Sequence, residues 1–158
     1  MAEVMEDRRA GSRKMIQELL SVRDRLLALY RDLAAQQPFS AKASVDLLEQ
    51  FCQALIDYTA DAHFRLYRYV DEKRERRRAV LEIAESVYAG VLTTTDEILK
   101  FNDRYDFSQG RKSLNLTTLD HDLSRLGECL ADRIELEDQI IRVLAAEAAQ
   151  RERWSGSA

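Results

Sequence analysis

Glycine and proline are scarce in this chain of 158 residues, which contains five glycines and one proline. Tight turns depend on these two residues, so their small number argues against a β-sandwich, a β-barrel or an α/β fold with glycine-rich nucleotide-binding loops. Because 46% of the residues are apolar and 33% are charged, the chain has enough apolar surface for one ordinary domain. We therefore expect one all-helical domain over residues 1–158, with flexible ends at 1–10 and 151–158.

Cysteine is also rare, and long apolar runs are missing. Cys52 and Cys129 lie far apart and form no Cys-x-x-Cys motif, which predicts small apolar core groups in a reducing compartment. The N-terminus lacks the apolar region of a signal peptide, and no apolar run approaches the roughly 20 residues that span a bilayer. We expect a cytoplasmic protein with no membrane contact.

Neither the charge nor the histidine content favours nucleic-acid binding or catalysis. With 28 acidic and 24 basic side chains, the formal charge is −4, which disfavours direct binding to nucleic acid and suits a basic partner. The two histidines, His63 and His121, are too few for the common Ser/His, Cys/His or multi-histidine metal sites. The sequence contains no P-loop, dinucleotide fingerprint or nucleophile elbow, so it predicts no cofactor and no metal.

Apolar residues recur at steps of three and four along four segments, a pattern typical of amphipathic helices. The expected helices run from a cap at Ser12 to Pro38, from a cap at Ser44 to about Val70, from Val80 to Tyr105, and from a cap at Thr117 or Thr118 to about Gln150. Gly90 and the threonines at 93–95 predict a bend in the third helix, and connectors are expected at Asp71–Arg78 and Asp106–Asn115. The simplest packing is an antiparallel four-helix bundle with long helices.

Three charged residues interrupt the apolar faces of these helices. Arg133 and Glu137 occupy the apolar seam of the fourth helix, and Arg23 falls inside the apolar arc of the first. A buried charge needs a partner, so one interpretation is an internal ion network, or side chains that extend to the surface. The other is a polar cavity that is open to a ligand or a partner.

The second helix carries the opposite exception, an aromatic residue on its polar side. Asp57 and Phe64 lie two turns apart, opposite the apolar seam, and share that side with Asp61 and Arg68. A large aromatic ring among polar neighbours is typical of an interaction anchor. The alternatives are an ordinary exposed aromatic residue or a helix that is buried on two sides.

The sequence resembles the bacterial Rsd/AlgQ family over most of its length. Four blocks carry the resemblance: Gly11–Lys14 with Val22–Tyr30, Phe51–Tyr58 with His63 and Phe64, Phe101–Asp106, and Leu123–Asp138. Four blocks in the same order are far more specific than one short motif. The resemblance implies a helical-bundle anti-sigma factor, not an enzyme, that binds the housekeeping sigma factor of RNA polymerase at region 4, the helix-turn-helix domain that reads the −35 promoter element.

The resemblance also assigns residues to the partner surface. The aspartate and the phenylalanine implicated in the family match Asp57 and Phe64, and Arg23, Arg133 and Glu137 fall within matching blocks. We therefore expect a surface of Asp57, Asp61, Phe64 and Arg68 to bind sigma and to occlude its DNA-reading and polymerase-binding surfaces. The alternative function is a bundle that binds a small molecule or a metal in the polar cavity of Arg23, Arg133 and Glu137.

Overall fold

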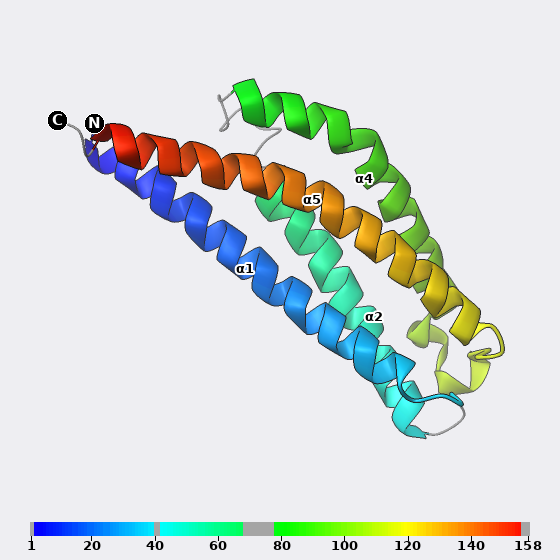
Figure 1. The fold of residues 1–158 in the computed structure, drawn as a ribbon. Coiled ribbons are helices and arrows are strands. Elements are labelled where there is room, and N and C mark those ends of the chain that lie inside the picture. The colour runs from blue at the N-terminus through cyan, green and yellow to red at the C-terminus, as the bar shows by residue number, and fades with distance from the viewer. Residues whose placement is uncertain (1, 40–41, 68–77, 156–158) are drawn as a thin grey trace.

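The computed structural model describes residues 2–39, 42–67 and 78–155, and these residues form long helices (Figure 1). The α-helices are α1 (Ala2–Ala34), α2 (Lys42–Ala62), α4 (Arg78–Arg104) and α5 (Leu119–Ser155). A π-helical turn, η1 (His63–Tyr67), continues α2, and two short 3-10 turns, η2 (Phe107–Gln109) and η3 (Arg111–Ser113), follow α4. The described residues include no strand, so the expected all-helical fold is confirmed.

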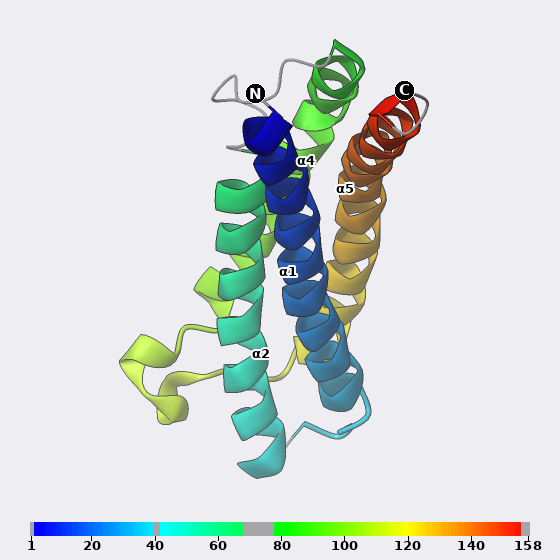
Figure 2. The same ribbon diagram turned by 90° about the vertical axis from the view of Figure 1, so that its left-hand side faces the viewer.

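The helices pack as a bundle in which consecutive helices run in opposite directions (Figure 1). Helix α1 packs against α2, α4 packs against α5, and α1 also contacts α5. Figure 2 shows α1 between α2 and α5, with α4 behind them. Leucine dominates the core; Leu19, Leu26, Leu48, Leu55, Leu119 and Leu130 are among its buried members.

Helix α4 is bent, as its threonines predict (Figure 1). The hydroxyl of Thr93 donates to the carbonyl of Ala89, and those of Thr94 and Thr95 both donate to the carbonyl of Val91. Such hydrogen bonds compete with the helical backbone for the same acceptors and bend the helix. The prediction of one bent helix is therefore confirmed.

The cysteines behave as apolar core groups. Cys52 and Cys129 are both buried and free. Burial raises the pKa of the Cys52 thiol to about 12 and that of Cys129 to about 11. Both side chains are therefore almost entirely protonated at neutral pH and have little nucleophilic character.

The starts of the first two helices differ from the predicted ones. Helix α1 begins at Ala2, so the expected cap at Ser12 is wrong. The residues before Ser12 are mostly good helix formers, and Gly11 inside the helix costs only about 1 kcal/mol relative to alanine. Ser44 is not a cap either, because α2 begins at Lys42 and the side chain of Ser44 is buried inside it. The flexibility expected of residues 1–10 and 151–158 stays a prediction.

The last helix begins where the sequence places it. Helix α5 starts directly after Thr118, whose carbonyl accepts a hydrogen bond from the backbone of Asp122 at 2.9 Å. It ends at Ser155, beyond the expected Gln150. The expected end of the second helix near Val70 lies outside the described residues, as does nearly all of the connector at 71–78.

Candidate functional site

The three charged residues that interrupt the apolar seams come together in the middle of the bundle. Arg133 and Glu137 are 1% and 0% exposed, and Arg23 is 6% exposed. Arg23 of α1 places Nη2 at 3.3 Å from Oε2 of Glu137, and Arg133 places Nε at 3.1 Å from Oε1 of the same carboxylate. Of the interpretations that the sequence left open, the internal ion network is confirmed.

Two tyrosines, which the amphipathic pattern of the sequence does not single out, complete this cluster. The hydroxyl of Tyr58 on α2 donates to Oε2 of Glu137, and that of Tyr67 on η1 donates to Oε1 at 3.0 Å. The guanidinium carbon of Arg133 lies 5.7 Å from the ring centroid of each tyrosine. Burial, followed by the charge of Glu137, raises the pKa of both tyrosines, so they remain protonated donors.

Further hydrogen bonds at the edge of the cluster connect it to α4 and to Asp138. Arg133 Nη1 donates to the hydroxyls of Thr94 at 3.2 Å and of Thr95 at 2.8 Å, both on α4. Arg23 Nη1 donates to Asp138 at 2.8 Å. Burial lowers the pKa of Arg23, but the hydrogen bond to Asp138 and the charge of Glu137 outweigh it, so the pKa is raised.

The cluster therefore joins α1, α2, α4 and α5 through two arginines and two carboxylates, Glu137 and Asp138. Four donors surround Glu137, and its side chain has no exposure to solvent. Such a balanced and closed arrangement suits a structural role better than ligand binding.

In the described part of the chain, no group of three or more His, Cys, Asp or Glu side chains is placed to hold a metal ion. Binding of a small molecule or a metal at Arg23, Arg133 and Glu137 stays a prediction.

Phe64 lies on the surface, as its place in the helical pattern predicts. Phe64 is 60% exposed, and its ring meets the ring of His63 edge-on, with the ring centroids 5.2 Å apart. Asp57, on the same side of α2, is exposed and accepts a hydrogen bond from Gln53 at 3.0 Å. The structure thus presents a large aromatic ring and an accessible carboxylate on one helix.

Asp61 and Arg68 do not extend this surface in the described structure. The side chain of Asp61 is only 17% exposed and accepts a hydrogen bond from Arg65 at 2.5 Å. Arg65 also pairs with Glu18 of α1. Asp61 is therefore held at the junction of α1 and α2, and the positive charge of Arg65 offsets its negative charge. Arg68 lies outside the described residues. Their part in binding a partner stays a prediction.

A second exposed apolar surface, absent from the sequence analysis, follows α4. Its four large apolar residues are between 41% and 61% exposed: Leu81, Tyr88, Leu92 and Leu99. Their spacing places them on one side of a helix, and this spacing is the sequence signal that identifies the surface. Tyr88, at 61% exposed, offers a matched comparison for Phe64.

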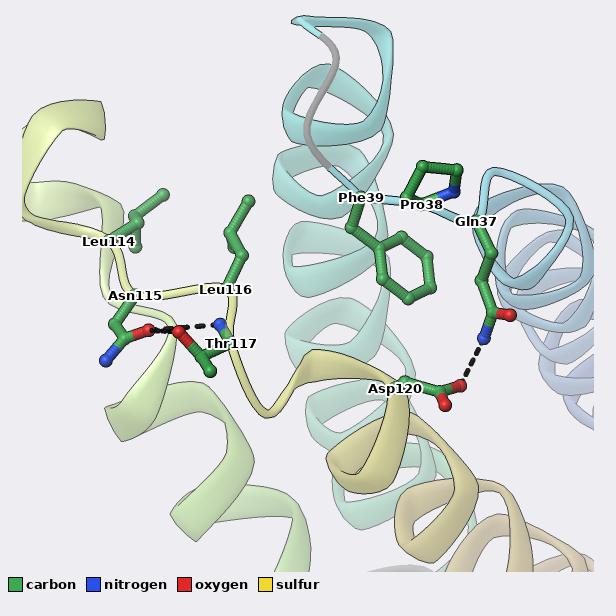
Figure 3. A pocket seen from close by; sticks show the side chains of 8 residues that line it. All are labelled: Gln37, Pro38, Phe39, Leu114, Asn115, Leu116, Thr117 and Asp120. Carbon is green, nitrogen blue, oxygen red and sulfur yellow. Dashed lines mark hydrogen bonds between the residues drawn. The ribbon is translucent and has the colours of Figure 1, made fainter.

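A pocket of about 930 Å³ lies at the end of the bundle where α2 and α5 begin (Figure 3). The connection between α1 and α2 contributes Phe39, and the connection between α4 and α5 contributes Leu116. Gln37 donates to Asp120 across one wall of the pocket. Phe64 lies beyond the other end of α2, so this pocket is separate from the predicted partner surface.

Comparison with known proteins identifies the family of the chain. The structure defines a helical bundle that is held by a buried network of arginines, carboxylates and tyrosines. The family model described as "Regulator of RNA polymerase sigma(70) subunit, Rsd/AlgQ" matches residues 1–145, and the chain belongs to this family. The resemblance found in the sequence is thereby confirmed.

Three relatives, each named "Regulator of sigma D", illustrate the similarity. The chain is 30% identical to the protein of Enterobacter sp. (strain 638) over 142 residues, covering 88% of this chain and 85% of the relative. It is 31% identical to that of Yersinia enterocolitica over 152 residues, covering 94% and 90%. It is 31% identical to that of Salmonella paratyphi B over 153 residues, covering 90% and 88%.

In the described part of the chain, no helix has an apolar stretch long enough to cross a membrane.

Proposed function

We propose that this protein is an anti-sigma factor that binds region 4 of the housekeeping sigma factor in the cytoplasm. Membership of a family of sigma(70) regulators supports this function. The single structural observation that carries it is the 60% exposure of Phe64 on the same side of α2 as the exposed Asp57. An aromatic anchor beside a carboxylate suits a partner that has an apolar pocket bordered by basic residues.

The two residues have different parts in the proposed complex. Burying the ring of Phe64 in the partner contributes apolar free energy, about 1.5–3 kcal/mol for a fully buried side chain of this size. Asp57 faces the basic residues that a helix-turn-helix domain otherwise presents to DNA phosphates. The net charge of −4 favours encounter with such a domain.

Occlusion is the proposed mode of action. A protein interface of standard size buries roughly 1,600 Å² in total, enough to cover the exposed surfaces of a small helix-turn-helix domain. Bound sigma then neither reads the −35 element nor docks on the polymerase core. The mechanism is stoichiometric binding and involves no chemical step.

A displacement experiment tests this function. Region 4 is bound to a fluorescent duplex that carries the −35 element, and the protein is added while anisotropy is recorded. We expect a one-to-one complex and release of the duplex. Phe64→Ala should require a higher concentration for release, whereas the control Tyr88→Ala should match the parent. Failure to bind sigma overturns the proposal, and binding without release of DNA overturns occlusion.

A further inference from the structure

Tyr58 and Tyr67 converge on one carboxylate although they are nine residues apart along the same run of helix. In a regular α-helix each residue turns by about 100°, so two residues at this spacing point in opposite directions. The departure from regular geometry is the π-helical turn η1, which begins after Ala62 and contains Tyr67. An inserted π turn accommodates one extra residue and rotates the residues beyond it.

Without this turn, Tyr67 would lie on the exposed side of the helix. A regular helix would place it in line with Ala60 and Ile56, which are both exposed, Ile56 at 48%. Instead, Tyr67 is half-buried and its hydroxyl lies 3.0 Å from Glu137. The π turn therefore brings the Tyr67 hydroxyl within reach of Glu137.

The same turn carries Phe64. On its inner side, Leu66 is fully buried and Tyr67 is bound to Glu137. On its outer side, Arg65 pairs with Asp61 and with Glu18 of α1. Phe64 thus belongs to a segment of five residues that is attached to the bundle on two sides.

We propose that Tyr67 and Glu137 are positioning residues that hold the π turn so that Phe64 is presented to sigma in a fixed direction. This inference rests on the proposed function, because it names the contacts that prepare that binding surface. Loss of the Tyr67–Glu137 hydrogen bond loosens the turn, so that Phe64, its second residue, stays on the exposed side but is no longer held in one direction. A side chain held in place before binding loses less conformational entropy in the complex.

A tryptophan probe at position 64 reports the direction of this side chain without any partner. Trp154 is the only tryptophan of the chain, so Phe64→Trp combined with Trp154→Phe leaves one reporter. In this background Tyr67→Phe removes the hydroxyl that binds Glu137 and keeps the ring beside Arg133. We expect a shifted emission maximum and a changed acrylamide quenching constant, with unchanged far-ultraviolet circular dichroism.

Two matched variants separate positioning from general loosening of the bundle. Tyr58→Phe removes the other tyrosine donor to Glu137, but from α2 before the π turn. Tyr105→Phe removes a tyrosine–carboxylate hydrogen bond of 2.5 Å to Asp122, outside η1. Both should leave the emission of the probe at position 64 at the value of the background protein.

Binding to the full-length housekeeping sigma factor, measured with Phe64 in place, completes the test. Tyr67→Phe should raise Kd about fivefold, because Phe64 then loses more conformational entropy when the complex forms. Tyr58→Phe and Tyr105→Phe should stay within about twofold of the parent Kd at a temperature where every variant is folded.

An unchanged probe signal in Tyr67→Phe overturns the inference, as does an equal change in Tyr58→Phe and Tyr105→Phe. A changed signal with unaltered sigma affinity also overturns it. If the parent protein binds no sigma, the proposed function fails, whereas the probe still decides whether Tyr67 sets the direction of residue 64. The two failures are therefore distinguishable.

Discussion

The buried cluster and the outward side of α2 are opposite exceptions to the same amphipathic pattern. In the cluster, three charges lie inside the bundle, and each finds a partner of opposite charge. On η1, which continues α2, Phe64 lies outside and is 60% exposed. The comparison teaches that an internal polar residue with partners supports the fold, whereas an exposed apolar residue contributes less to it; at such a residue, Phe64, we propose that a partner binds.

The largest effect is expected inside the cluster. Arg133→Ala should lower the free energy of unfolding by about 3 kcal/mol, because Glu137 keeps its burial but loses one of its two arginines. Arg133→Met should cost less, since it fills the space beside Tyr58 and Tyr67. Urea unfolding followed by circular dichroism measures both. Midpoints equal to that of the parent for both variants would contradict a stabilising network.

The next effect should fall on binding and leave the fold intact. Phe64→Ala should weaken sigma binding by about 2 kcal/mol, mainly through faster dissociation, with little change in melting temperature. Tyr88→Ala removes an equally exposed ring from α4 and should leave binding unaltered. Surface plasmon resonance and thermal melts provide the measurements. A Phe64→Ala protein that melts several degrees lower yet binds normally would show that Phe64 supports the fold and does not bind sigma.

Alkaline pH should weaken the cluster and spare the surface. Burial and Glu137 raise the pKa of Tyr58 and Tyr67 in the folded protein above the ordinary value of 10.0. Because the folded state retains these protons, their stabilising contribution is complete below pH 10 and declines as the pH rises above it. Above this pH, each tyrosine should reduce the free energy of unfolding by up to about 1.4 kcal/mol per pH unit.

Tyr67→Phe offers the control for this dependence. The variant should show a shallower loss of stability between pH 10 and 12 in urea titrations, because one group no longer titrates. An identical slope in the variant and the parent would exclude Tyr67 as a contributor.

The smallest effects should come from the carboxylates of α2. Asp57→Ala should weaken sigma binding by about 1 kcal/mol and make association slower and less sensitive to salt. Asp61→Ala should change association less, because Arg65 already offsets the charge of Asp61. Association rates at low and high salt measure both effects. A larger loss for Asp61→Ala than for Asp57→Ala would place the partner nearer to α1.

Much of the candidate site follows from local periodicity. Arg23, Arg133 and Glu137 fall on apolar faces at three- and four-residue steps, and the structure buries all three. Phe64 falls opposite such a face, and the structure exposes it. A helix has a fixed rotation per residue, so which side a residue occupies depends on its spacing from its neighbours.

The contacts of Tyr67 and Asp61 did not follow from spacing. Tyr67 reaches Glu137 through a π turn, and this carboxylate lies 70 residues further along the chain. Asp61 is turned towards α1 because Arg65 pairs with both Asp61 and Glu18. Such contacts depend on which helices become neighbours, which helical periodicity does not specify.

By itself, therefore, the sequence determined the helical class, the four long helices, the inward charges and the outward aromatic ring, because amphipathic patterning and the scarcity of glycine and proline act locally. Only the tertiary structure decided that the inward charges form a closed network and that α2 ends in a π turn. The fold places the buried carboxylate of Glu137 on α5 within reach of two tyrosines, Tyr58 on α2 and Tyr67 on η1. A regular helix would point the two tyrosines in opposite directions, whereas the π turn, which also carries Phe64, brings both to Glu137.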